Sequence, residues 1–134
     1  MNTYNTLEIV AVWNGILIQG YMDGTFMTAE HDEDAVMKHT GAGGDVTRTI
    51  NANKGGAVTF TLTQSSLTNN ALSAAGTDKG SLLVKDLHGT TLISAEESWV
   101  KKKARVEYAK EVTGREWIID CAALAMTVAG AADA

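Results

Sequence analysis

The sequence predicts a mainly β protein, an antiparallel β-barrel or sandwich with one short flanking α-helix. Apolar and polar residues alternate with a period of two in many short runs, which is the pattern of half-buried strands. Asn-Gly, Asp-Gly and His-Gly turn signals separate these runs. The 134 residues are 45% hydrophobic and 20% charged, which suits one folded domain over residues 1–134 with a core of its own.

Three strands are expected in the first thirty residues. Leu7–Trp13 and Ile16–Gly20 both alternate, and Asn14-Gly15 lies between them. Because Asn and Gly tolerate the positive φ of a type I′ turn, these two strands should form a hairpin. Thr25–Glu30 is the third predicted strand and follows an Asp-Gly turn.

A long polar stretch, "KHTGAGGDVTRTINANKGG" from Lys38 to Gly56, follows the third strand. Loops longer than about 12–15 residues usually bind something, cover something or stay disordered. Its "GAGG" lacks the strand–loop–helix context and the Lys-Ser/Thr ending of a phosphate-binding loop. Val46–Asn51 has a strand pattern instead, so the sequence predicts a polar hairpin arm that protrudes at about residues 31–56.

The segment after the arm contains a strand and then the predicted helix. In "AVTFTLT", Val58, Phe60 and Leu62 share one face of a half-buried strand. The helix is expected in "SSLTNNALSAAG", with Ser65 or Ser66 as its N-cap and Gly76 just beyond its end. The residues expected on its apolar stripe are Leu67, Ala71, Leu72 and Ala75.

Four further strands are predicted towards the C-terminus. They are Leu82–Asp86, Leu92–Glu96, Arg105–Lys110 and Glu116–Ala122, with His88 in a turn between the first two.

No catalytic centre, and no cofactor site, is assembled by the sequence. The histidines His31, His39 and His88 lack metal-ligand spacing, and neither a G-x-S-x-G elbow nor an HExxH motif is present. Cys121 is the only cysteine and lies in "WIIDCAALAM", where apolar neighbours favour a small buried hydrophobe over a nucleophile. The protein is therefore predicted not to be an enzyme.

The acidic cluster "AEHDED", from Ala29 to Asp34, is the strongest candidate for metal binding. Adjacent side chains on an extended segment point to opposite faces, so at most Asp32 and Asp34 converge. Calcium takes six to eight oxygen ligands. A solvated or inter-subunit face is therefore favoured, and no metal site is predicted.

The charge and the hydropathy of the chain argue against nucleic acid and membrane as partners. A net charge of -5 and a pI near 5.1 oppose binding to a phosphate backbone. In the one basic patch, "WVKKKARVEYAKE", flanking glutamates cancel most of the field, which favours a charged edge or subunit contact. Trp13, Trp99 and Trp117 lie in alternating runs, where burial is more usual than a carbohydrate-binding face. No apolar run approaches the roughly 20 residues of a membrane span, and a lone cysteine fits a reducing compartment.

Four segments, taken in order, resemble the tail tube proteins of contractile-tailed bacteriophages. They are "ILIQGYMDGTF", "AEHDEDAVMKHTGAGGDVTRTINANKGGAVTFTLTQSSLTNNALS", "LLVKDLHGTTLISAEESWVKKKARVEYAKE" and "TGREWIIDCAALAM". The resemblance implies the phage tail tube fold and a structural subunit that assembles into stacked hexameric rings, forming the conduit for DNA ejection. The chain departs from the pattern at "GAGGD", Gly41–Asp45, and at Leu67, where proline is common.

The resemblance also implies partners and a location. The partners are other copies of the chain, the tail sheath, the tape-measure protein, and the tail terminator and baseplate proteins, with DNA only in transit and no membrane. The protein would belong to the virion tail tube and be made in the host bacterial cytoplasm. A polar arm that reaches beyond its own core and a charged edge are the expected contacts between subunits. The candidate contact residues are Asp32, Asp34, Lys38, Asp45, Arg48, Asn51, Lys54, Lys102 and Arg105.

Two alternatives stay open on the sequence alone. One is a soluble β-sandwich module that binds a glycan or calcium through its tryptophans and its acidic turn. The other is a small hydrolase, which only the scattered histidines favour.

Overall fold

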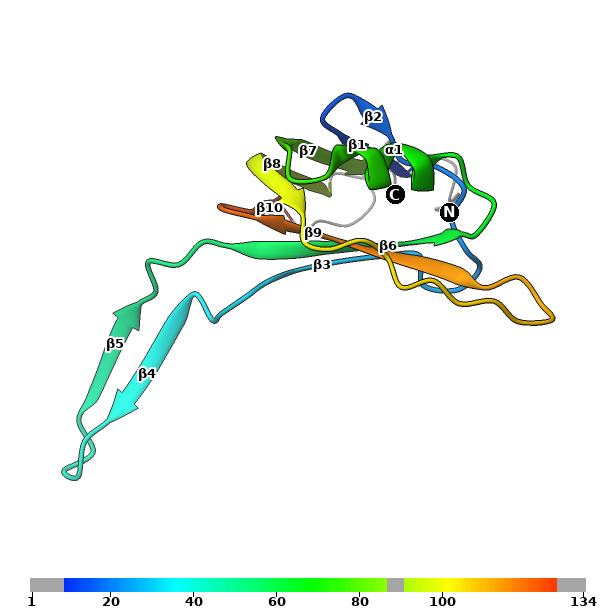
Figure 1. Ribbon diagram of the computed structural model, residues 1–134. Coiled ribbons are helices and arrows are strands. Elements are labelled where there is room, and N and C mark those ends of the chain that lie inside the picture. The colour runs from blue at the N-terminus through cyan, green and yellow to red at the C-terminus, as the bar shows by residue number, and fades with distance from the viewer. Residues whose placement is uncertain (1–8, 87–90, 128–134) are drawn as a thin grey trace, which may run out of the picture.

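The computed structural model describes residues 9–86 and 91–127, and within them the chain is mainly antiparallel β-sheet with one short helix. The predicted fold class is thus confirmed. Figure 1 shows two layers of strands, with the helix next to β2 in the upper layer, and a hairpin that extends away from this body. No helix among the described residues is long and apolar enough to cross a membrane. The elements are β1 (Ile9–Trp13), β2 (Ile16–Leu17), β3 (Met27–His31), β4 (Val36–Thr40), β5 (Val46–Ile50), β6 (Gly56–Thr63), α1 (Thr68–Ala75), β7 (Lys79–Asp86), β8 (Leu92–Val100), β9 (Gly114–Cys121) and β10 (Ala125–Thr127).

The first hairpin forms as the sequence predicts. Asn14 has φ 49° and Gly15 has φ 81°, and Trp13 pairs with Ile16 across the turn. Both residues tolerate this left-handed conformation, which matches the twist of the two strands. The part of the predicted first strand that begins at Leu7 lies outside the described residues until Ile9.

One curled sheet forms the body. Its strand order is β2-β1-β7-β8-β9-β6-β3, and β10 pairs with the end of β8. After β2 the chain crosses to the other end of this order, where Thr63 N–H donates to Gly20 O at 2.8 Å and Met22 N–H donates to Thr61 O at 3.0 Å. The crossing ties the two ends of the sheet together, so the β3-β6-β9 layer faces the β1-β7 layer.

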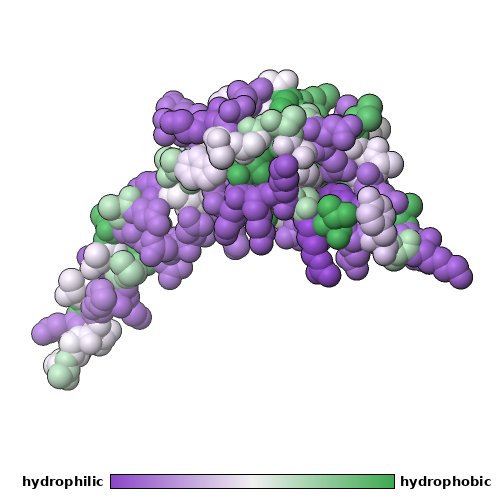
Figure 2. All heavy atoms as spheres, in the orientation of Figure 1, coloured by the Kyte–Doolittle hydropathy of each residue, from purple (hydrophilic) through white to green (hydrophobic). Residues whose placement is uncertain are grey.

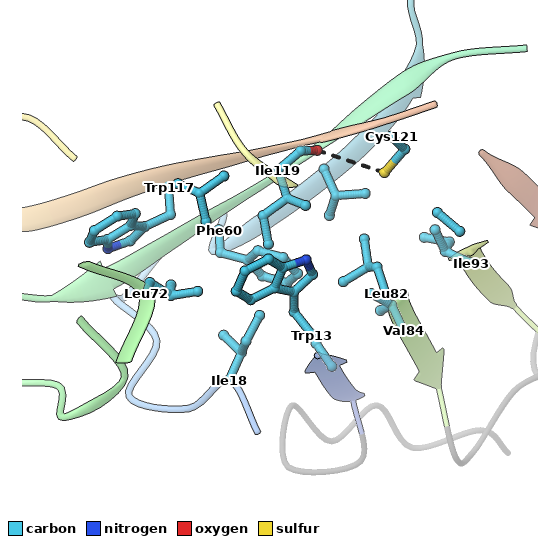
Figure 3. Packing of buried hydrophobic residues seen from close by; sticks show 14 of the residues in the cluster. Trp13, Ile18, Phe60, Leu72, Leu82, Val84, Ile93, Trp117, Ile119 and Cys121 are labelled. Carbon is cyan, nitrogen blue, oxygen red and sulfur yellow. Dashed lines mark hydrogen bonds between the residues drawn. The ribbon is translucent and has the colours of Figure 1, made fainter. Parts of the chain in front are cut away.

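The core lies between these two layers. Alternate residues of the strands point inward, so β6 buries Val58, Phe60 and Leu62 in the pattern that the sequence predicts. Figure 3 shows that Trp13 of β1 and Phe60 of β6 enter the core from opposite layers and that Leu72 of α1 belongs to the same cluster. Two of the three tryptophans, Trp13 and Trp117, are buried, as expected from their alternating runs.

Buried hydrogen bonds fix the orientation of both tryptophans. The Trp13 indole N–H donates to Ser98 Oγ at 2.9 Å, and Ser98 Oγ–H donates to Gly80 O at 2.8 Å. The Trp117 indole N–H donates to Asn69 Oδ1 at 2.8 Å, which connects β9 to α1. Because a buried donor without a partner is costly, these contacts select one packing of the core.

Helix α1 begins later than predicted. Its N-cap is Leu67 rather than Ser65 or Ser66, and Leu67 is 77% exposed instead of lying on the buried stripe. Ser66 lies one residue earlier, in the turn after β6, where its N–H donates to Thr63 O at 3.1 Å. Its Oγ–H donates to Gln19 O at 2.7 Å, and its Oγ accepts the Thr68 N–H at 3.3 Å. Gly76 ends the helix with φ 59°, as the sequence predicts.

The predicted strand Arg105–Lys110 is wrong, because β8 ends at Val100 and β9 begins at Gly114. Apolar and polar residues alternate here, but this segment pairs with no described strand, and Val106 and Tyr108 are exposed. Strands β4 and β10 were not predicted, and the turn expected at His88 lies outside the described residues.

Replacing Ser98 by alanine should lower the free energy of unfolding by about 1–3 kcal/mol, because the Trp13 N–H and the Gly80 carbonyl would both lose their buried partner. Urea denaturation followed by circular dichroism measures this change. Ser73→Ala on the partly exposed side of α1 is the matched control and should change stability by less than about 0.5 kcal/mol. Equal effects of the two substitutions would contradict the role given to Ser98.

Candidate assembly surface

The arm is the segment between β3 and β6, and its root is tied together by backbone hydrogen bonds. Asp32 N–H donates to Gly55 O at 3.0 Å, and Asn51 N–H donates to Ala35 O at 2.9 Å. The root is also attached to the body, since Leu124 N–H donates to Lys54 O at 2.9 Å. The arm therefore leaves the body in a defined direction.

Asparagine side chains reinforce the root. Asn53 Oδ1 accepts a hydrogen bond from Gly55 N–H at 2.9 Å, and Asn51 Oδ1 accepts one from Asn53 N–H at 2.9 Å. The Asn53 amide also donates to the Glu33 carboxylate across the root. Such short-range bonds let asparagine hold a turn that regular sheet pairing does not supply.

Gly56 marks the point at which the root joins the sheet. A Cβ atom there would lie 2.7 Å from Glu30 O and 2.6 Å from Leu124 Cδ2. The backbone carbonyl cannot move aside without breaking the β3–β6 pairing, so only glycine fits this close approach.

Beyond the root, β4 and β5 form a two-stranded antiparallel ribbon with no third strand. The pairs run from Val36↔Ile50 to Thr40↔Val46, and all ten strand residues are exposed. The tip closes through Gly41 N–H, which donates to Asp45 O at 2.7 Å. A ribbon of this kind is marginally stable by itself in water.

The arm is less polar than the sequence suggested. Val46 is 63% exposed and Ile50 is 66% exposed, and Val36 and Met37 also expose much of their side chains. Figure 2 shows hydrophobic and hydrophilic residues side by side along the arm. These few apolar residues were hidden among the polar and glycine residues that dominate the segment.

The two ends of the body sheet differ in how their edges are covered. At β2, Thr68 Oγ–H donates to Leu17 O at 3.4 Å, and Gln19 N–H donates to Thr68 Oγ1 at 3.3 Å, so α1 satisfies this edge. At the other end, β3 pairs only with β6 among the described residues. An open strand edge is a template for pairing with another chain.

The predicted contact residues fall into two groups. Residues Asp32, Asp34, Lys38, Asp45, Arg48, Asn51 and Lys54 lie on the arm or its root, and Asn51 is engaged in the root itself. Lys102 and Arg105 line a groove beneath the β8–β9 loop, together with Lys103, Glu107 and Glu116. Figure 1 places this loop at the end of the body opposite the arm.

A second groove, which the sequence analysis missed, lies on the outer side of β7 and β8. Its lining includes Ser81, Leu83, Glu96, Glu97, Ala123 and Ala125. The pairing of β7 with β8 shifts between Gly80 and Leu82, so Ser81 lies opposite both Glu96 and Glu97. This β-bulge turns two consecutive carboxylates to solvent. The adjacent glutamates in the sequence were the available signal.

The acidic cluster and Cys121 were the two candidates for a reactive site in the sequence. No group of three His, Cys, Asp or Glu side chains within residues 9–86 and 91–127 is arranged to hold a metal ion. Cys121 is buried, as the sequence predicts, and its thiol contacts Ile119 O at 3.8 Å. The pKa of Cys121 is raised to about 11, first by burial and then by the nearby charges of Asp120 and Asp32. The thiol therefore stays protonated near neutral pH.

Comparison with known proteins finds a relative of this chain in a phage. No protein-family model matches the chain. The chain is 26% identical over 113 residues to "Structural protein ORF10" of Pseudomonas phage KPP10, a match that covers 76% of this chain and 64% of that protein. The match thus spans less than two thirds of the relative's length.

Two solved structures share the fold. The tube-terminating cap of the anti-feeding prophage gives a TM-score of 0.59 at 6% identity, covering 95% of this chain and 92% of that one. The sheath/tube terminator of the extracellular contractile injection system PVC gives a TM-score of 0.57 at 8% identity, covering 96% of this chain and 99% of that one. At such low identity the likeness shows the fold alone.

The Cys121 thiol should react with iodoacetamide at pH 8 at least about 100-fold more slowly in the native protein than in urea, because only the thiolate is a nucleophile and its pKa is raised to about 11. Mass spectrometry of timed samples gives both rates. The raised pKa also means that this thiol stabilises the fold fully below about pH 8.5 and that the contribution is lost as pH rises through about 11. Native labelling as fast as in urea would contradict this burial.

Proposed function

We propose that the protein is a structural, non-enzymatic component of a phage tail: a tail tube subunit whose copies assemble into stacked hexameric rings around the conduit for DNA ejection. The observation that carries the proposal is the arm, a fully exposed two-stranded ribbon with a firmly held root. Such an element cannot bury its own apolar residues. A neighbouring subunit can.

The exposed groups of the arm fit a contact between subunits. Both outer edges of the β4–β5 ribbon present backbone N–H and C=O groups without a third strand, and pairing or covering by another chain would satisfy them. Exposed Val46 and Ile50 would also be removed from water in such a contact. In a ring each contact recurs at every equivalent site, so a modest contact stabilises the whole assembly.

The comparisons support a role in a phage tail. The sequence relative is named a structural protein of a phage, and the two solved structures are named as a tube-terminating cap and a sheath/tube terminator. On this proposal the partners are further copies of the chain, the sheath, the tape-measure protein, the terminator and the baseplate, and the site of action is the virion tail. The net charge of -5 fits a conduit that does not bind DNA phosphates in transit.

A second candidate is a tube terminator, which the names of the two structural neighbours favour. A tube subunit offers complementary surfaces at both ends of its ring and therefore polymerises. A terminator stops growth after one ring. Whether the purified protein polymerises into tubes or stops at single rings distinguishes the two roles.

A glycan- or calcium-binding module fits the structure less well. Trp13 and Trp117 are buried and cannot form the aromatic platform on which a glycan would stack. In the acidic cluster, Glu33 is already held by Asn53 at the root of the arm.

Replacing Val36–Ile50 by an Asn-Gly turn should leave a folded protein that no longer assembles. The removed ribbon packs on no part of the core, whereas Ala35, Asn51 and the root bonds to Gly55 are retained. Circular dichroism should show an unchanged fold and a melting temperature within about 5 °C of the parent. Electron microscopy and sedimentation should show tubes for the parent only.

The matched control is Gly43→Ala at the tip, where an added Cβ meets nothing closer than 4.0 Å, and it should still form tubes. Single rings from the parent would favour the terminator role. Tubes from the shortened variant would show that the arm is a passive loop, and a parent that stays monomeric at all concentrations would refute self-assembly.

A further inference from the structure

One face of the arm carries two cations directly opposite each other. In the β4–β5 ladder, Lys38 pairs with Arg48, and opposite residues of an antiparallel pair point to the same side. We call this side the cationic face. The ladder places these residues on it: Val36, Lys38, Thr40, Val46, Arg48 and Ile50. Apolar side chains thus flank the two cations on both sides.

This arrangement opposes the stability of the isolated ribbon. Like charges directly opposite in a sheet are destabilising, and a two-stranded ribbon has little stability to spare. Within the described residues, neither Lys38 nor Arg48 has an ion-pair partner. A partner that supplies two negative charges between apolar contacts would convert the repulsion into attraction.

The groove on β7 and β8 has the complementary features. The bulge presents Glu96 and Glu97 to solvent, and neither has an ion-pair partner among the described residues. Leu83 lies in the same groove and is 47% exposed, beside the small side chains of Ala123 and Ala125. Two carboxylates therefore lie next to an apolar surface.

The spacings of the two surfaces also match. Directly opposite residues in a sheet have Cβ atoms about 4.5–5.5 Å apart, and consecutive residues have Cα atoms about 3.8 Å apart. The two cations and the two carboxylates can therefore face each other pairwise.

We infer that the cationic face of the arm docks into the groove formed by Leu83, Glu96 and Glu97 of a second copy of this chain. The occupant is a second copy because the arm extends away from its own body (Figure 1), and its root bond to Leu124 holds it in that direction. The inference rests on the proposed self-assembly and names the two surfaces that meet in it.

Charge exchange tests the pairing. Lys38→Glu/Arg48→Glu and Glu96→Lys/Glu97→Lys should each reduce the sedimenting, assembled fraction at least tenfold, since each places like charges in contact. The chain that carries all four substitutions should regain at least half of the parent's assembly. Raising the NaCl concentration should weaken the parent and the four-fold variant alike, because partly exposed charge pairs are screened.

The opposite face of the same arm provides a control of matched net charge. Lys38→Gln/Arg48→Gln and Thr47→Glu/Thr49→Glu each change the net charge by -2, but Thr47 and Thr49 lie on the other face of the ladder. Only the first pair should reduce assembly severalfold. Equal loss from both pairs would point to net charge rather than to this contact and would overturn the inference.

Cross-linking distinguishes a contact between copies from one within a copy. Chains with Lys38→Cys are mixed with chains with Glu97→Cys, and mild oxidation should join them as a covalent dimer, since native Cys121 is buried. If the parent assembles but the four-fold variant does not recover and no dimer forms, the inference fails while self-assembly stands. A parent that never assembles removes both.

Discussion

A two-stranded ribbon has no core and two unpaired edges, and this constraint governs what the arm can be. The β4–β5 ribbon exposes all ten of its strand residues, so its own contacts contribute little stability. The root fixes the direction of the arm but does not stabilise the ribbon along its length. It does so through the hydrogen bonds that join Asp32 to Gly55 and Leu124 to Lys54. An element that is held firmly at one end, and whose strand edges and side chains are exposed along its length, is suited to bind another molecule.

The body provides the support that such an arm needs. Strand β6 begins at the root and continues between β3 and β9 through the middle of one layer, so force on the arm is transmitted into the core. The opposite layer is locked to it by the core around Trp13, whose indole reaches Ser98 on β8. Helix α1 covers the β2 edge and connects to β9 through Asn69. Among the described residues, the strands that keep an open edge include β3, β10 and those of the arm.

Structural features that depend on one residue or on a short local pattern could be predicted from the sequence. Asn14-Gly15, the alternation around Phe60 and the end of the helix at Gly76 were predicted because turn conformation and side-chain period are local properties. The strand expected at Arg105–Lys110 failed because alternation is necessary for a strand but a neighbour is also required. The predicted helix start was wrong because Ser66 still belongs to the turn after β6, where it bonds to Thr63 O, and its Oγ–H bonds to Gln19 O, 47 residues away in sequence.

The candidate site was only partly readable for the same reason. The arm could be located from its length and glycines, and Lys38 and Arg48 could be named as charged contacts. Their direct opposition depends on the register of β4 with β5, and the glutamate groove depends on a bulge between β7 and β8. Both are relations between segments. Composition and periodicity describe single segments and do not show how two segments pair.

The central claim is that the arm is completed by another copy of the chain, and a cryo-electron microscopy map of the assembled protein tests it most directly. The account predicts that density for β4 and β5 is continuous with a neighbouring subunit, with Lys38 and Arg48 within ion-pair distance, about 4 Å, of that subunit's carboxylates. A map in which the arm projects freely into solvent, or packs against its own body, would contradict it.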